Sequence, residues 1–150
     1  MPEFDDDWHA EWWGGMEASG GNIIAAMRMR VVERGAERVV LSMPLSPGVR
    51  QGTGVFAAGA LMQLADVGAT MAYFEAAGGT EENPVPFPLS IQISVNLLRN
   101  TDRGRAISES RIIHHGRTLT VVESKVHDDD GRLLCIGTST HVPSPARRTS

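Results

Sequence analysis

The sequence predicts an α+β fold in which an antiparallel β-sheet is wrapped around one long central helix. The first observation is that residues 55–78, VFAAGALMQLADVGATMAYFEAAG, are almost entirely apolar and contain no Lys or Arg. The second is that four strand-like segments follow, joined by short turns. Strands joined by hairpins pair antiparallel, and a helix packed on such a sheet defines the α+β class. A helix that is apolar on most sides must also be covered on most sides, so we expect the sheet to curl around it.

The elements are expected in the order short helix, two strands, long helix, four strands. The expected ranges are helix 16–27, strands 29–33 and 37–43, helix 55–78, and strands 89–97, 105–113, 118–127 and 132–142. Gly78-Gly79 is typical of a helix C-terminus. Residues 89–97 alternate between apolar and polar, which predicts a half-buried strand. The strand over 118–127 changes phase near Val121-Val122, which indicates a β-bulge.

Composition and charge narrow the function classes. A chain of 150 residues fits one domain, and its net charge of −4 gives no general attraction to nucleic acid or to an anionic membrane. No apolar run is long enough to span a bilayer, and the acidic, aromatic N-terminus is unlike a signal peptide, so we expect a cytoplasmic protein. We divide the chain into a peripheral segment (1–21), one domain (22–142) and a tail (143–150). Cys135, the single cysteine, lies in an apolar run and is expected in the core.

Asp66 is the most informative residue, because it is a carboxylate in the middle of the long apolar helix. At about 100° per residue, one broad apolar face is formed by Leu61, Leu64, Ala65, Gly68, Met71 and Ala72. The polar residues form a stripe, namely Gln63, Asp66, Thr70 and Tyr73. An unpaired buried carboxylate costs several kcal/mol or takes up a proton. Asp66 therefore marks a functional site, or else it bonds neighbouring backbone or Thr70, or faces a subunit contact.

Three segments carry a resemblance to a known family. They are GALMQLADVGATMA (59–72), PLSIQISVNLLRN (88–100) and GRTLTVVESKVHDDDGRLL (116–134). Over roughly residues 22–142 the chain resembles hotdog-fold acyl-CoA thioesterases of the phenylacetate-degradation, 4-hydroxybenzoyl-CoA thioesterase-like group. The resemblance implies a hotdog fold, hydrolysis of an aryl or medium-chain acyl-CoA, and no cofactor other than the coenzyme A of the substrate. It also implies a homodimer that assembles into a dimer of dimers.

The resemblance assigns catalytic roles to named positions. The family's helix carboxylate, a general base or nucleophile, falls on Asp66, and the loop amide that orients water or the thioester falls on Gln51. The family's His-Gly-Gly helix start is replaced by Ala57-Ala58-Gly59, so the oxyanion donor would be the N–H of Ala58, with Gly59. A methyl group at Ala58 could crowd the carbonyl, since Gly permits closer approach. Thr70 would assist one turn later, although a helical Thr often bonds the carbonyl one turn back.

The same resemblance implies positions that contact substrate and coenzyme A. These are Ser90, Arg99, Gly116, Arg117 and Thr118. Their plain alternative is an ordinary role on strand ends and turns. No metal site is expected, because His127 with Asp128–Asp130 matches no calcium loop and Gly131 fits a hairpin turn.

The spacing along the helix sets a condition on the mechanism. Asp66 lies about two turns beyond the helix start, roughly 10–12 Å along the axis. That is too far for both groups to act on one carbonyl from the same subunit, except with a bent approach. The dimeric arrangement that the resemblance implies resolves this, because the oxyanion donor and the carboxylate of one site then come from different subunits. Two other functions remain open. A non-catalytic acyl-CoA-binding protein is favoured by the altered helix start, whereas a hydratase or dehydratase would need a His that Ala57 does not supply.

Overall fold

The computed structural model describes residues 23–80 and 82–144. Its elements are α2 (Ile23–Ala26), β1 (Arg30–Arg34), β2 (Val39–Pro44), a 3₁₀ turn η1 (Pro47–Val49), α3 (Ala58–Ala77), β3 (Pro88–Leu97), β4 (Arg105–His115), β5 (Thr120–Asp128) and β6 (Leu133–Pro143). The expected order is confirmed for this part of the chain. Of the short helix expected over 16–27, only α2 falls within the described residues. The peripheral segment 1–21 and residues 145–150 of the tail lie outside them.

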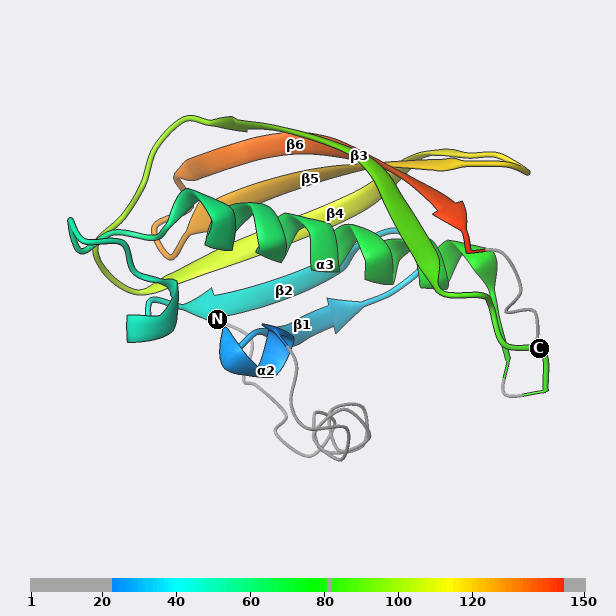
Figure 1. Cartoon of the computed structure of the whole chain (residues 1–150), viewed down its shortest axis with the longest axis horizontal. Helices are drawn as coiled ribbons and strands as arrows, with labels where there is room; N and C mark the ends of the chain where they lie inside the picture. Colours follow the sequence, from blue (N-terminus) through cyan, green and yellow to red (C-terminus); the bar gives the residue numbers. More distant parts are fainter. Residues whose placement is uncertain (1–22, 81, 145–150) are drawn as a thin grey trace, which may run out of the picture.

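The six strands form one antiparallel sheet with the order β1-β2-β4-β5-β6-β3. Figure 1 shows α3 lying across this sheet, with β1 along one side and β3 along the other. The strand that follows α3 in the chain thus lies at the far edge, beside β6, and not next to β2. This confirms the α+β class and the curled sheet around a central helix.

The buried face of α3 is the predicted one. All six residues of the expected apolar face are buried. Gly68 lies close to β4, where Ser108 and Ser110 face it. The hydroxyl of Ser124 on β5 donates to the carbonyl of Ala65 at 3.3 Å. Small residues on both elements therefore let the helix backbone sit close to the sheet.

The first turn of α3 begins at Ala58, three residues later than expected. Phe56 forms a β-bridge with Arg50, and Ala57 is extended at the N-cap position with a ψ of 138°. Asn100, in the β3–β4 connection, donates to the carbonyl of Phe56 at 2.8 Å and accepts from its N–H at 3.1 Å. These bonds hold residues 55–57 out of the helix. At the other end, Gly78 adopts a left-handed φ of 64° and its N–H bonds Phe74, as the Gly-Gly pair predicts.

The expected β-bulge is present, but on the neighbouring strand. Ile112 pairs with Val122 and His114 pairs with Val121, so the extra residue is Ile113 of β4. The strand β5 keeps its alternation, because its buried positions are every second residue from Thr120 to Asp128. The apparent phase change at residues 121–122 arises because Val121 and Val122 are both apolar but lie on opposite faces of β5.

The prediction of a half-buried β3 was wrong for the single chain. Its large apolar side chains are exposed, with Ile91 at 59% and Leu97 at 47%. Two causes are visible: β3 is an edge strand, and an extra residue at Ile91 interrupts its pairing with β6. Such an apolar strand edge is a surface on which another strand can pair.

Candidate active site

Asp66 lies in the middle of α3 and is hydrogen-bonded to β3. The Ser90 hydroxyl donates to Asp66 Oδ1 at 2.7 Å. The free-energy cost of burying the Asp66 carboxylate is smaller than the sequence suggested, because Asp66 is only partly buried and lines an open pocket. The partner that the sequence suggested for a structural role, Thr70, lines the same pocket one turn further along the helix.

A buried histidine stands behind Ser90. His141 of β6 pairs with Ser90 of β3 in the sheet and is fully buried. Its Nδ1 lies 3.4 Å from Ser90 Oγ, and its Nε2 lies 2.8 Å from the hydroxyl of Ser139. Burial lowers the pKa of His141 below its ordinary value, and the negative charge of Asp66 opposes this effect only in part. His141 was not predicted as a site residue. Alternation along a strand places it on the same face as Cys135, which was expected in the core.

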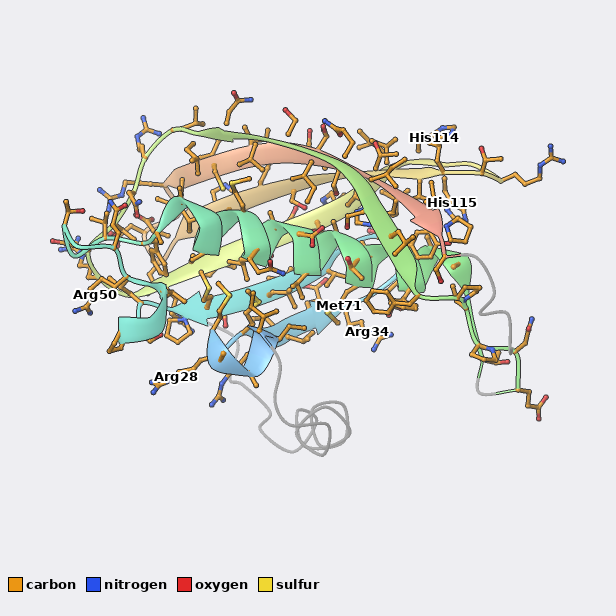
Figure 2. The ribbon with its side chains drawn as sticks, viewed as in Figure 1. Arg28, Arg34, Arg50, Met71, His114 and His115 are labelled. Atoms are coloured by element: carbon orange, nitrogen blue, oxygen red, sulfur yellow. The ribbon has the colours of Figure 1, made fainter. Side chains whose placement is uncertain are left out.

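The pocket beside Asp66 has a volume of about 760 Å³. One side is formed by α3, and Figure 2 shows Met71 of this helix near Arg34 of β1. The full lining is Ile23, Ile24, Arg34, Gln63, Asp66, Val67, Thr70, Met71, Phe74, Phe87, Pro88, Leu89 and Ser90. The rings of Phe74 and Phe87 meet edge to face at 5.7 Å. The pocket is thus mainly apolar, with its hydroxyls and carboxylate gathered around Asp66.

The predicted polar stripe of α3 is divided between two environments. Gln63, Asp66 and Thr70 line the pocket. Tyr73 is instead buried, and its ring packs 6.4 Å from the rings of both His115 and His141. Tyr73 is thus separated from the three residues of the stripe that line the pocket.

The predicted oxyanion donors lie at the exposed start of α3. The Ala57 N–H is occupied by the carbonyl of Val49 at 2.8 Å, and helical bonding resumes with Ala60. The N–H groups of Ala58 and Gly59 belong to the first turn, where a helix offers no internal acceptor. Both residues are exposed. Gln51 lies in the preceding loop, also exposed, and its Nε2 donates to Thr53 Oγ1 at 2.9 Å.

The single chain does not bring all predicted site residues together. Asp66, Thr70 and Ser90 share the pocket, whereas Gln51, Ala58 and Gly59 gather near the start of α3. Figure 1 shows the β3–β4 connection, which contains Arg99, at the opposite end of the sheet from the β4–β5 turn. That turn holds Gly116, Arg117 and Thr118, and Figure 2 labels His114 and His115 next to it. Ser90, which was grouped with these residues, lies instead beside Asp66.

Two further properties concern the chemistry available. Among residues 23–80 and 82–144, no group of three or more His, Cys, Asp or Glu side chains is arranged to hold a metal ion. Cys135 is buried as expected, and burial raises the pKa of its thiol to about 11, which makes it a poor nucleophile.

Among residues 23–80 and 82–144, no helix is both long and apolar enough to cross a bilayer.

The sequence profile of the Thioesterase superfamily matches residues 53–135. This is more than half of the chain, and it includes α3, the strand β3 and the Asp66–Ser90 pair. The chain therefore belongs to the Thioesterase superfamily. Hydrolysis of thioesters is the general activity to which this membership points.

Individual relatives agree with that assignment. The chain is 28% identical over 118 residues to "Putative esterase ComA2" of Bacillus subtilis (strain 168), covering 79% of this chain and 90% of the relative. The crystal structure of a mutant of thioesterase PA1618 from Pseudomonas aeruginosa superposes with a TM-score of 0.75 at 26% identity, covering 87% and 94%. Thioesterase HI1161 from Haemophilus influenzae has a TM-score of 0.77 at 18% identity, covering 89% and 90%. These structures confirm the expected hotdog fold.

Proposed function

We propose that this protein is an acyl-CoA thioesterase of the phenylacetate-degradation, 4-hydroxybenzoyl-CoA thioesterase-like group. The observation that carries the proposal is the position of Asp66 beside an apolar pocket. Ser90 occupies Oδ1, and among the described residues no protein donor contacts Oδ2. A carboxylate oxygen in this position can accept a proton from water next to a bound acyl group.

The pocket supports an aryl or medium-chain acyl group. Its volume of about 760 Å³ is in the range of small-molecule sites, which are mostly apolar with a few polar groups. Phe74, Phe87 and Met71 provide flat and flexible apolar surface. Gln63, Asp66 and Thr70 supply polar groups along the α3 side of the pocket, which suits an apolar chain that ends in a reactive carbonyl.

In the proposed reaction, Asp66 acts as a general base. Oδ2 removes a proton from water, and the resulting hydroxide forms a bond to the thioester carbon. Negative charge then develops on the carbonyl oxygen, where the N–H of Ala58, with Gly59, stabilises it. Collapse of this intermediate breaks the carbon–sulfur bond, and the departing coenzyme A thiolate takes the proton from Asp66. Gln51 orients the water or the thioester, and Thr70 assists Asp66. If Asp66 instead attacked directly, a mixed anhydride would form, and single-turnover hydrolysis in ¹⁸O-water would label the Asp66 carboxylate when water attacks the Asp66 carbon of that anhydride.

The proposal requires two subunits in each site. The Ala58 amide and Asp66 are separated along one helix, and the exposed apolar edge of β3 offers a surface for a second copy. In the homodimer that we propose, and in a dimer of dimers built from it, Arg99 and the Gly116–Thr118 turn contact coenzyme A. Arginine is well suited to the phosphates of coenzyme A.

A non-catalytic acyl-CoA-binding protein is the second candidate. The Ala57-Ala58-Gly59 sequence at the helix start favours it, because the methyl group of Ala58 restricts close approach of a carbonyl.

The test is a panel of short-chain, medium-chain and aryl acyl-CoA thioesters, assayed with a free-thiol reagent. We expect turnover, with higher kcat/KM for aryl or medium-chain than for acetyl thioesters. The buried Cys135 keeps the reagent background low. Binding of these thioesters without release of coenzyme A would contradict the proposal and identify the binding protein instead.

A further inference from the structure

The buried His141 has no role in the reaction as described so far. It is fully buried, it pairs with Ser90 across β3 and β6, and it belongs to none of the positions that the family resemblance supplies. His141 belongs to a series of four hydrogen-bonded side chains, Ser139, His141, Ser90 and Asp66, in which Ser90 connects it to Asp66 in the pocket.

The Ser90 hydroxyl fixes the direction of this hydrogen-bond chain. A hydroxyl carries one proton, and Asp66 Oδ1 at 2.7 Å takes it, because a carboxylate can only accept. Towards His141, Ser90 Oγ must then accept, so the imidazole proton lies on Nδ1. If the imidazole is neutral, its Nε2 atom is then an acceptor, and the hydroxyl of Ser139 donates to it at 2.8 Å. The hydrogen bonds therefore all run in one direction. Ser139 donates to His141, His141 donates to Ser90, and Ser90 donates to Asp66.

This arrangement requires a neutral imidazole. An imidazolium carries a proton on both nitrogens, so it could not accept from Ser139. The titratable groups on this side of the molecule are Asp66 and Tyr73 of α3 and His115 of β4, whose ring packs against Tyr73. Burial keeps the pKa of His141 low despite the charge of Asp66, which is consistent with the neutral form.

We propose that His141 is a positioning residue for thioester hydrolysis. It donates to Ser90, Ser90 in turn is held on Asp66 Oδ1, and the carboxylate is thereby oriented with Oδ2 towards the pocket. Without the histidine, the Ser90 hydroxyl is free to rotate to other acceptors, and the base loses its fixed orientation. Orientation of a catalytic group affects the chemical step more than substrate binding. The inference rests on the proposed thioesterase function.

The experiment compares two substitutions at this position. In His141→Asn the side-chain amide can place an N–H close to the position of Nδ1, whereas His141→Phe keeps a ring and removes both nitrogens. We expect His141→Phe to lower kcat about tenfold, equivalent to about 1.4 kcal/mol, with KM within about twofold. We expect His141→Asn to recover most of that loss. His115→Phe is the matched control, because His115 also packs against Tyr73 but does not contact Ser90; its kcat should equal that of wild type.

The tautomer is measured separately, by long-range ¹H–¹⁵N NMR of the histidine side chains at neutral pH. We expect a neutral His141 protonated on Nδ1, and a proton on Nε2 would overturn the inference even if His141→Phe does not fold. Equal kcat losses in the Asn and Phe variants, or wild-type kcat in His141→Phe, would also overturn it. A wild-type protein without turnover contradicts the thioesterase proposal itself, and the role of His141 in that reaction falls with it. An active wild type with unaffected His141 variants contradicts the positioning role alone.

Discussion

Ala58 and Asp66 lie on one unbroken helix, and the eight residue steps between them separate the two by about 12 Å along its axis. A thioester carbonyl bonded to the Ala58 N–H is therefore out of reach of Asp66 in the same chain. The distance is fixed by helix geometry and does not depend on side-chain conformation. In the proposed enzyme, each site combines the helix start of one subunit with the carboxylate of another.

Subunit mixing tests this division of the site. Gln51 lies near Ala58 at the start of α3, so it belongs to the half of the proposed site that holds the oxyanion donor. Gln51→Ala therefore impairs that half, and Asp66→Asn impairs the half that holds the carboxylate. A dimer with one Gln51→Ala chain and one Asp66→Asn chain would contain one intact site and one doubly altered site. We expect each variant alone to be impaired and the purified mixed dimer to recover about half of the wild-type kcat per dimer.

Mixed dimers can be prepared by coexpression with two different affinity tags. Each tagged single-variant dimer, purified in the same way, is the control. If the mixed dimer is no more active than the average of the two single-variant dimers, both groups act within one chain and the two-subunit site is wrong.

Gly68 provides a prediction about stability. A β-carbon at this position would lie 2.6 Å from Ser110 Oγ, and Ser110 is held by a 2.7 Å hydrogen bond to Ser124. Gly68→Ala should therefore destabilise the fold by about 1–2 kcal/mol, since overpacking of about 1–3 kcal/mol outweighs the gain in helix propensity of up to about 1 kcal/mol. Thermal unfolding should show a lower Tm.

The double variant Gly68→Ala, Ser110→Ala is the control for this mechanism. It removes the hydroxyl that the new methyl group meets, so it should recover part of the lost stability relative to Gly68→Ala. A Tm for Gly68→Ala at or above the wild-type value would show that the helix and sheet are not in close contact here.

The buried His141 predicts how stability depends on pH. Its pKa in the folded protein lies below the ordinary value of 6.5, mainly because of burial. Between the folded pKa and about 6.5, the unfolded chain binds more protons than the folded one, so the free energy of unfolding falls as the pH falls through this window. Above the window this contribution is fully present.

The measurement is chemical denaturation between pH 5 and 7.5 for wild type and His141→Asn. Other groups titrate in both proteins, so the difference between the two curves isolates His141. We expect the wild type to lose more stability on acidification than the variant does. A wild-type curve that is flatter, or parallel to that of His141→Asn, would contradict a buried neutral histidine.

Much of the fold could be predicted because local sequence patterns determine it. The six apolar positions of α3 and the Gly78 stop depend on helix periodicity and backbone conformation alone, and both are confirmed. The bulge was placed on the wrong strand, because a phase change in β5 cannot be distinguished from a Val that happens to lie on the other face. The exposure of β3 depends on strand order, which the alternation of its residues does not encode.

The candidate site was predictable only in part, for a related reason. Asp66 stood out because a carboxylate is unusual in an apolar helix. Its bond to Ser90 links residues 24 positions apart, and the connection to His141 links Ser90 to a residue a further 51 positions along the chain. Contacts of this kind arise from the pairing of β3 with β6, and no spacing in the sequence signals them. The pocket also depends on how α2, α3 and β3 are brought together.

The most direct test of the thioesterase account is the kcat of Asp66→Asn with the best acyl-CoA substrate. The side-chain amide keeps an oxygen for the Ser90 hydroxyl but cannot accept a proton from water, so the fold should survive while the base is lost. We predict a kcat at least about 100-fold below wild type with an unchanged Tm, in the range expected for removal of a general base. Asp102→Asn, at an exposed carboxylate away from the pocket, should retain full activity. A kcat for Asp66→Asn within a few-fold of the wild-type value would contradict the account.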